Sequence, residues 1–300
     1  MTSELKVKCP QCGAPSVLCF STGDLNRKLT NATFFYHECG SCSLIFLHPV
    51  PKSLAPYYPE GYYDLPATHE ALAANAKHEA YKIELVRRHV RKGRVIEVGP
   101  ATGGFCYLAK EAGYDVEAIE MDQRCSNFLR SALGIKVLNS ATETEALRSL
   151  QPANVIALWH VLEHLLDPWK MLEAIQDRLS PGGIAVIATP NPQAIQFQIW
   201  GKRWVHVDAP RHLFLIPSAV LVHRMRRLGL ELVELTTRDP GGVGWNRFGW
   251  VFGASNLSPI SALDRPFRAI GRLIGLAAAP FEGIEGKGAA YTAIFRKSIG

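Results

Sequence analysis

Four cysteines near the N-terminus have the residue type and the spacing to bind a metal ion. They form two C-x-x-C pairs, Cys9 with Cys12 and Cys39 with Cys42, separated by 26 residues. Tetrahedral zinc is commonly held by four such thiolates on two tight turns, and a site filled by four protein ligands is closed and structural. We therefore predict that Zn²⁺ stabilises residues 1–50, a segment too small for a core of its own. Reduced thiols without a metal are the alternative interpretation.

A second group of residues has the chemistry of a nucleotide-binding turn. Residues 97–105 read Glu-Val-Gly-Pro-Ala-Thr-Gly-Gly-Phe and follow a short apolar run. Glycines at a sharp turn from strand to helix let the backbone approach a ligand closely. Glu120 lies about twenty residues further on, where a carboxylate can accept hydrogen bonds from both ribose hydroxyls. The two features predict an adenosine ligand across the ends of two neighbouring strands.

The details of the turn favour S-adenosylmethionine over a dinucleotide. A dinucleotide site has the pattern G-x-G-x-x-G, and Ala101 stands at its second glycine. Glu97 adds a carboxylate, which is unfavourable beside a pyrophosphate but favourable beside a ligand carrying an ammonium and a sulfonium. A glycine-containing turn without any ligand is the remaining interpretation.

Histidines supply the candidates for proton transfer. Residues 204–213 contain His206, Asp208 and His212, and His160 follows another apolar run. A histidine titrates near neutral pH, so His206, His212 or His160 could act as a general base, with Asp208 orienting it or binding the substrate. A structural hydrogen bond is the alternative for each. The run from His160 to His164 also fits H-x-x-E-H, a zinc protease pattern, but that motif belongs inside a helix.

Bulk composition excludes several classes of protein. The 300 residues are 47% hydrophobic and 20% charged, which is ordinary for a globular chain, and the net charge of +6 has no continuous basic stripe to suggest nucleic acid as substrate. The first residues do not read as a secretory signal, and we expect a cytoplasmic protein. We expect the other three cysteines to be buried as apolar residues, because none has a partner at ligand spacing. These are Cys19, Cys106 and Cys125.

Hydrophobic runs and turn residues divide the chain into three zones. Residues 1–50 form the predicted zinc ribbon, and residues 51–80 a connector rich in proline and tyrosine. From residue 81 to 300, helices alternate with strands, which indicates a mostly parallel sheet covered by helices on both faces. We predict seven strands, at 94–98, 116–119, 135–138, 155–159, 184–188, 230–235 and 290–295. Helices are expected at 103–112, 123–133 and 217–228, with another that begins after Asp167.

Several of these segments together resemble the class I S-adenosylmethionine-dependent methyltransferases, which have a Rossmann-like α/β fold. The resemblance covers about residues 80–235 and rests on residues 97–105, 118–122, 159–168 and 179–183. It departs from the family at Ala101, where a glycine is usual. The resemblance implies that the first turn contacts the methionine part of the cofactor through Glu97, Gly99, Pro100 and Gly103. It implies that Glu120 and Met121, at the end of the second strand, contact the ribose. Trp159 and His160, at the end of the fourth strand, would line the methyl end.

The N-terminal segment sharpens the resemblance. Residues 39–51 and 57–63 look like those of bacterial small-molecule methyltransferases with an N-terminal zinc ribbon, whose acceptors include sugars and natural-product intermediates. We therefore expect methyl transfer to a small molecule, at an oxygen of a sugar, aromatic or natural-product acceptor. Methylation of protein or RNA, and a non-catalytic zinc-ribbon binding module, are the alternatives.

The last part of the chain suggests how the acceptor is approached. Residues 236–288 form an insertion before the last strand, and residues 240–256 within it combine glycines with Trp245, Phe248 and Trp250. This composition suits a mobile lid or an aromatic substrate wall, with a packed loop as the alternative. Residues 265–281 mix arginines with apolar residues and could contact a membrane surface, a lipid-linked substrate or a second copy of the chain.

Overall fold

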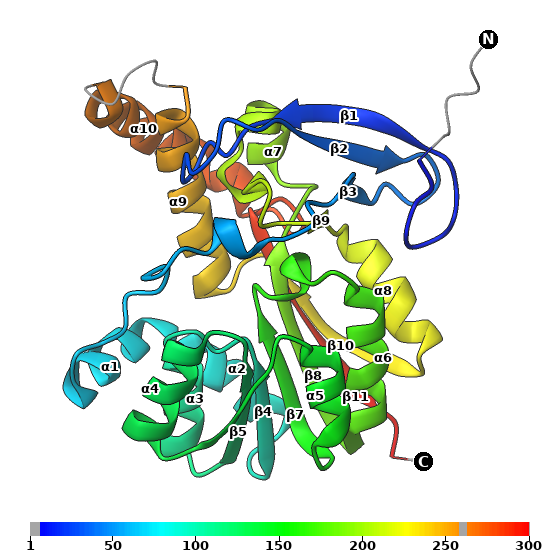
Figure 1. The fold of residues 1–300 in the computed structure, drawn as a ribbon, viewed down its shortest axis with the longest axis vertical. Helices are drawn as coiled ribbons and strands as arrows, with labels where there is room; N and C mark the ends of the chain where they lie inside the picture. Colours follow the sequence, from blue (N-terminus) through cyan, green and yellow to red (C-terminus); the bar gives the residue numbers. More distant parts are fainter. Residues whose placement is uncertain (1–6, 258–262, 300) are drawn as a thin grey trace.

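The computed structural model describes residues 7–257 and 263–299, and a seven-stranded sheet forms its centre (Figure 1). Its order is β10-β11-β8-β7-β4-β5-β6. Strands β8, β7, β4, β5 and β6 pair in parallel, and only β11 runs antiparallel to its neighbours among these described strands. The bounds are β4 (Arg94–Val98), β5 (Asp115–Glu120), β6 (Lys136–Asn139), β7 (Ala153–Trp159), β8 (Leu179–Pro190), β10 (Leu230–Thr236) and β11 (Ala290–Lys297). The predicted Rossmann-like sheet is confirmed.

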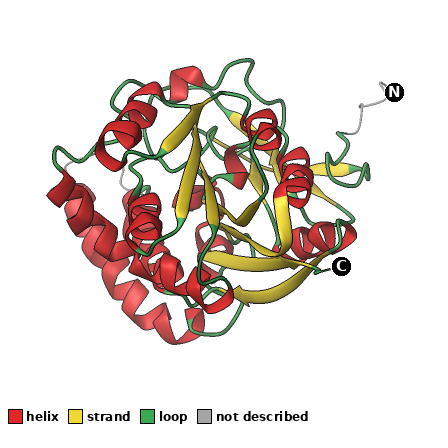
Figure 2. Ribbon diagram, turned by 90° about the horizontal axis from the view of Figure 1, so that it is seen from below, coloured by secondary structure: helices red, strands yellow, loops and turns green. Residues whose placement is uncertain are grey.

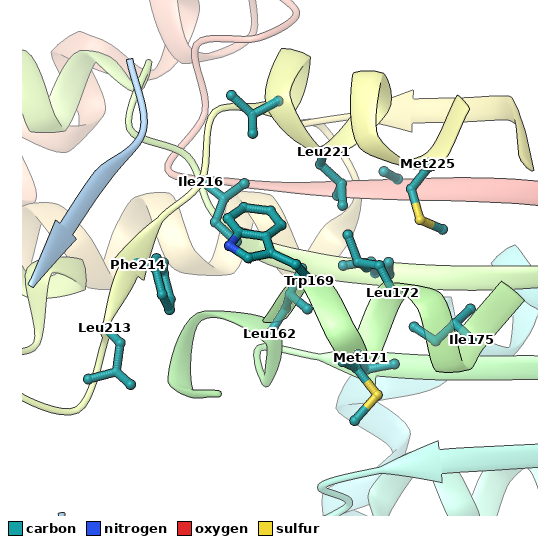
Figure 3. Close-up of a cluster of buried hydrophobic side chains, with 14 of the residues drawn as sticks. Leu162, Trp169, Met171, Leu172, Ile175, Leu213, Phe214, Ile216, Leu221 and Met225 are labelled. Atoms are coloured by element: carbon teal, nitrogen blue, oxygen red, sulfur yellow. The ribbon is translucent and has the colours of Figure 1, made fainter. Parts of the chain in front are cut away.

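Helices cover both faces of this sheet (Figure 2). Side chains alternate across a strand, and in β4 Val95 packs into one apolar cluster while Ile96 and Val98 pack into the other. Figure 3 shows part of the second cluster, where Leu172 and Leu221 from two helices meet. The helices beside the sheet are α2 (Ala80–His89), α3 (Gly104–Glu111), α4 (Gln123–Leu133), α5 (Glu143–Ser149), α6 (Pro168–Arg178) and α8 (Ser218–Arg227).

Capping residues explain why several helices begin and end where the sequence predicts. The Asp122 carboxylate accepts from two backbone N–H groups at the start of α4, and Gly134 ends that helix at φ +61°. The Asp167 carboxylate caps α6, and Pro168 occupies its first turn. These local signals fix the helices that follow β5 and β7, and therefore the positions of the loops at the carboxyl ends of those strands.

One predicted loop is a helix, and two further segments have structure that the sequence analysis did not specify. Residues 240–256, expected as a lid or loop, form α9 (Pro240–Ser255), which begins at the Asp239 cap. The connector at 51–80 contains α1 (His69–Ala76), capped by Thr68. The turn at 180–183 is drawn into β8, with Gly182 at φ +74°. In α9 the cap and the packing against neighbours override the low helix propensity of five glycines.

The N-terminal segment forms a second sheet that is completed by the other part of the chain. Its order is β1-β2-β3-β9, from β1 (Ser16–Thr22), β2 (Phe34–Cys39), β3 (Ile45–Leu47) and β9 (Phe214–Leu215). Because β9 lies between α7 (Ile195–Trp200) and α8, the small sheet combines the N-terminal segment with a strand about 170 residues further along the chain (Figure 1). The sheet of the N-terminal segment therefore continues across the predicted boundary near residue 50, because β3 before it pairs with β9 after it.

A buried ion-pair cluster joins the loop after β1 to the segment before β9. The Arg211 guanidinium is fully buried and donates to Asp24, after β1, at 2.7 Å and to Asp208 at 2.8 and 2.9 Å. Asn26 donates to Asp208 at 2.6 Å. A guanidinium can form such paired bonds with carboxylates, which compensates for its removal from water. Within the described ranges, no helix is long and apolar enough to cross a membrane.

We expect Arg211→Met to destabilise the protein strongly. The substitution leaves the Asp24 and Asp208 carboxylates buried without a cation, a change that typically costs about 3–5 kcal/mol. Thermal unfolding should show a fall in Tm of roughly 5–15 °C. Arg148→Ala, which removes a more exposed and longer pair with Asp177 at 3.7 Å, is the matched control and should shift the Tm little. An equal shift for both variants would contradict the structural role of Arg211.

Candidate cofactor and acceptor site

The turn after β4 has backbone angles that suit a closely approaching ligand. Gly99, Ala101 and Gly103 lie at φ +67°, +49° and +79°. A Cβ added at Gly99 would lie 2.7 Å from the Val161 side chain, and one at Gly103 would lie 2.3 Å from that of Leu129. Ala101 keeps the left-handed conformation despite its methyl group, at a cost of about 1–2 kcal/mol. The residue that departs from the family pattern therefore preserves the shape of the turn.

Glu120 connects the turn to the end of β5. Its Oε2 accepts from the Ala101 backbone N–H at 2.9 Å, and its Oε1 accepts from that of Asp122 at 2.8 Å. The side chain is buried, and burial raises its pKa although the backbone N–H groups of Asp122 and Ala101 counteract this. These bonds hold the carboxylate at the carboxyl end of the sheet, beside the turn that should bind the cofactor.

Glu97, at the start of the same turn, is a buried carboxyl group in a dry environment. Its Oε2 accepts from the Cys106 thiol at 2.9 Å. Burial raises the pKa of Glu97 to about 7, although the Lys82 ammonium acts to lower it. The group therefore changes its charge near neutral pH, where a cationic ligand would favour the ionised form.

Two residues that precede β4 in the chain lie beside this turn, and the sequence did not predict either of them. A Cβ at Gly104 would lie 2.9 Å from the Glu79 carboxylate, so Glu79 sits against the first turn of α3. Lys82 donates to Glu79 at 2.7 Å, and its ammonium lies 5.0 Å from the ring centroid of Trp159. Their i, i+3 spacing gave only a weak signal, because such pairs are common on solvated helices.

The end of β7 brings a strained histidine to the edge of the sheet. His160 lies at φ +57°, and its backbone N–H donates to the Ala188 carbonyl of β8 at 2.9 Å. Left-handed backbone at a non-glycine residue often marks a functional site. Its Nδ1 lies 3.5 Å from Glu163 Oε1, and its side chain keeps 22% exposure, whereas that of Glu163 has none. Glu163 follows in a single 3-10 turn, Leu162–His164, rather than in the α-helix that a protease motif requires.

Glu163 is held as a charged group inside the protein. Its Oε2 accepts from the Thr189 hydroxyl at 3.1 Å. Burial acts to raise its pKa, but His160, His212 and His164 outweigh this effect and lower the pKa to about 2. A buried carboxylate beside His160 can hold the imidazole in one orientation.

The other predicted histidine positions are more enclosed. Burial, with the charges of His212 and His160, lowers the pKa of His206 to about 3. His212 Nδ1–H donates to the His206 carbonyl at 2.8 Å. A base with a pKa near 3 holds a proton weakly at neutral pH, so His206 is poorly matched to proton abstraction. His160, His206 and His212 are close in space, and His160 is the most exposed of the three.

Asp208 lies at the same edge but is committed to the ion-pair cluster. Although burial acts to raise it, the Arg211 side chain and neighbouring charges lower its pKa to about 2. The Arg211 side chain is fully buried by the same cluster. Asp208 therefore acts on the histidines through the backbone turn that it holds at φ +37° rather than by facing the acceptor.

Aromatic side chains from α9 form one wall of the histidine cluster. The Trp245 ring lies 4.9 Å from His160 and 5.2 Å from His206, and Phe248 lies 5.5 Å from Trp245. The connector supplies further aromatic side chains. Tyr58 Oη lies 3.0 Å from His164 Nδ1. Burial, and to a smaller extent the charge of Glu120, raises the pKa of Tyr63. The predicted aromatic wall thus has a physical basis, although a helix carries it.

The four N-terminal cysteines meet as their spacing predicts. Three Sγ–Sγ distances are 3.5, 3.7 and 3.8 Å. A tetrahedral zinc ion with Zn–S bonds of about 2.3 Å requires sulfur atoms about 3.8 Å apart. The backbone N–H groups of Ser41 and Cys42 point at Cys39 Sγ from 3.4 Å. Cys106 and Cys125 are buried as expected, whereas Cys19 is exposed on β1, and that expectation was wrong.

Comparison with known proteins places the central part of the chain in one family. A family described as "Methyltransferase domain" matches residues 70–235. The ubiquinone biosynthesis O-methyltransferase of Acinetobacter baylyi is 26% identical over 156 residues, which cover 48% of this chain and 65% of that protein. The protein of the same name from Bordetella bronchiseptica is 30% identical over 150 residues, covering 46% and 62%. The matched region thus spans less than two thirds of these relatives.

Solved structures show the same fold at low sequence identity. An S-adenosylmethionine-dependent methyltransferase from Archaeoglobus fulgidus has a TM-score of 0.50 and 18% identity, over 74% of this chain and 94% of that one. A protein from Galdieria sulphuraria described as a sarcosine dimethylglycine methyltransferase has a TM-score of 0.52 and 13% identity, over 77% and 88%. At such identities the likeness concerns the fold.

We expect the affinity for S-adenosylmethionine to fall as the pH decreases through about 7. Glu97 has a raised pKa, so it is ionised above this value and loses its negative charge below it. Calorimetric titration between pH 8.5 and 5.5 should show Kd rising by up to about tenfold per pH unit on the acid side. Glu97→Gln should bind weakly and lack this component, and the exposed Glu84→Gln should keep it. Superimposable profiles for the wild type and Glu97→Gln would exclude Glu97 as the responsible group.

Proposed function

The chain belongs to the methyltransferase domain family matched over residues 70–235 and is a class I S-adenosylmethionine-dependent methyltransferase. On this premise we propose that it methylates an oxygen atom of a small-molecule acceptor. The relatives matched over nearly half of the chain are named as O-methyltransferases of ubiquinone biosynthesis, which supports a small molecule and oxygen as the methylated atom.

The observation that carries this proposal is the His160–Glu163 pair at the end of β7. His160 is partly exposed and its Nδ1 faces a fully buried carboxylate at 3.5 Å, so its Nε2 remains for an acceptor. Removing a proton from a hydroxyl acceptor requires a base that is held in place and can accept charge. Glu163 supplies the opposing charge, and Thr189 fixes that carboxylate from β8.

The remaining residues of the site divide between binding and orientation. S-adenosylmethionine, when bound, supplies a methyl group on a sulfonium leaving group. Glu120 would accept hydrogen bonds from the ribose, and the turn at Gly99 and Gly103 would let the backbone approach the methionine part. Glu97 would offset positive charge, with Pro100 and Met121 beside these contacts. Trp159, close to Phe105 and Lys82, would line the region between the cofactor and His160.

We also propose that Cys9, Cys12, Cys39 and Cys42 hold one structural zinc ion. The sulfur spacing fits a tetrahedral ion, and the N–H groups directed at Cys39 Sγ favour its thiolate form. Zinc would clamp the ends of β1 and β2, and β3 of the same sheet pairs with β9 of the catalytic part. Its role would thus be to fix the segment that carries His212 and Arg211.

We expect His160→Ala to remove most methyl transfer while leaving cofactor binding nearly intact. A labelled-methyl screen with phenolic and sugar hydroxyl compounds would first identify an acceptor, after calorimetry has shown S-adenosylmethionine binding. On that acceptor, His160→Ala should lower kcat about 10²–10⁴-fold, the usual contribution of a general base. Glu163→Gln should lower it less and shift the pH profile, because it acts through His160.

The surface histidine His223 gives the matched control, and His223→Ala should keep full activity. Equal activity of His160→Ala and the wild type across the pH range would refute the base assignment. Absence of S-adenosylmethionine binding at about 100 µM would refute the proposed activity itself, since enzymes commonly bind their substrates between 1 µM and 1 mM.

We expect the purified protein to contain one zinc ion per chain. Cys12→Ser should remove it and lower the Tm, because the turns at residues 9–12 and 39–42 would lose the ion that joins them. Mass spectrometry of the metal content and thermal unfolding measure the two effects. Cys19→Ser, at an exposed cysteine outside the cluster, should change neither. A protein with full stability and no bound metal would show that the thiols do not need zinc.

A further inference from the structure

Helix α10 (Asp264–Glu282) carries large apolar side chains on the face that points away from the protein. Leu273 and Leu276 are 67% and 74% exposed, and Ile270 and Phe281 on the same helix are 50% and 59% exposed. Figure 1 shows α10 at the edge of the molecule, beside α9. Contiguous exposed apolar residues of this size mark a contact surface rather than ordinary surface variation.

The inner face of α10 explains why its apolar residues point outward. Gly271 and Gly275 contact α9, where a Cβ at Gly271 would lie 2.4 Å from the Trp250 carbonyl oxygen. Glu282 is buried at the far end and accepts from Gln196 and the Trp250 indole, each through Oε1. The helix therefore docks on α9 through its backbone and one carboxylate, which leaves the leucines without partners among the described residues.

Arginines surround this apolar face, and carboxylates to neutralise them are scarce. Arg265 and Arg272 are exposed on α10, and three more lie beside them: Arg238, Arg247 and Arg268. Within residues 7–257 and 263–299, none of the five has a carboxylate oxygen within 4.0 Å. Glu282 is buried, and Glu285 accepts from the Thr237 backbone N–H. The surface is thus both apolar and cationic.

We propose that α10 docks this protein on the surface of a bilayer containing anionic phospholipids. A helix that lies in the membrane interface has an apolar face that enters the acyl region and arginines that reach the phosphates. The charge of this surface argues against a second copy of the chain as the occupant. A twofold contact would bring two sets of arginines together, and Asp264 is the one acidic residue of α10 that is exposed enough to oppose them.

The cavity beside α10 fits the same ligand chemistry. A cavity of about 590 Å³ lies between α9 and α10, with Trp250, Val251 and Leu276 among its apolar lining and Arg247 and Arg272 at its polar positions. An acyl or isoprenoid chain with a phosphate head offers the matching combination. α9 also carries Trp245, which contacts His160, so the helix that supports the docking face reaches the catalytic histidine. Docking requires no methyl transfer and is tested separately from it.

Co-sedimentation with lipid vesicles tests the proposal. The full chain should bind vesicles of phosphatidylcholine mixed with phosphatidylglycerol at least about tenfold more tightly than vesicles of phosphatidylcholine alone. Leu273→Glu combined with Leu276→Glu should abolish binding to both. Arg265→Gln combined with Arg272→Gln should weaken binding to the anionic vesicles by at least about tenfold and have little effect on the neutral ones.

Ile299→Glu, at a residue 81% exposed outside α10, is the matched control and should bind vesicles as the wild type does. Calorimetry with S-adenosylmethionine checks that each variant is folded. No binding to anionic vesicles, or binding that the double leucine variant retains, overturns the proposal. A dimer in light scattering that this variant dissociates, without any vesicle binding, would assign the face to a second copy instead.

Discussion

The buried positive charge of Arg211 is the constraint on which the arrangement of the site depends. A guanidinium without water must be met by carboxylates, and Asp24 and Asp208 come from segments that are 184 residues apart in the sequence. Satisfying it brings the loop after β1 against the turn that carries His206 and His212. The N-terminal sheet is therefore part of the frame around the histidines, which links the four-cysteine cluster to the proposed acceptor side.

The same enclosure sorts the histidines by function. Burial makes the charged form of His164 and His206 costly and lowers their pKa values to about 4 and 3, so they serve as neutral packing and hydrogen-bonding groups. His160 keeps contact with solvent and faces Glu163, whose pKa is lowered chiefly by His160 itself against the effect of burial. His160 is therefore the histidine of the cluster proposed to accept a proton, and the buried histidines pack around it.

The sequence predicted what local signals determine. Caps such as Asp122 and Asp167, and the glycines after β4, specify helix ends and a turn without reference to the rest of the fold. The contact of Asp24 with Arg211 leaves no local signal, because either residue alone reads as a surface charge. Helix α9 was missed for the related reason that its glycines are required by close packing, as at Gly249 beside Gln196, which only the tertiary structure reveals.

The two sides of the site obey different constraints, which explains why the cofactor was recognisable and the acceptor was not. The turn and Glu120 are the proposed contacts to a ligand common to a whole family, so their spacing carries the signal. The proposed acceptor side draws on the connector, the loop before β9 and helix α9, and these contribute single aromatic rings such as Trp245 and Tyr58. Specificity that is assembled from distant segments follows from the fold, because no segment contains enough of it to form a motif.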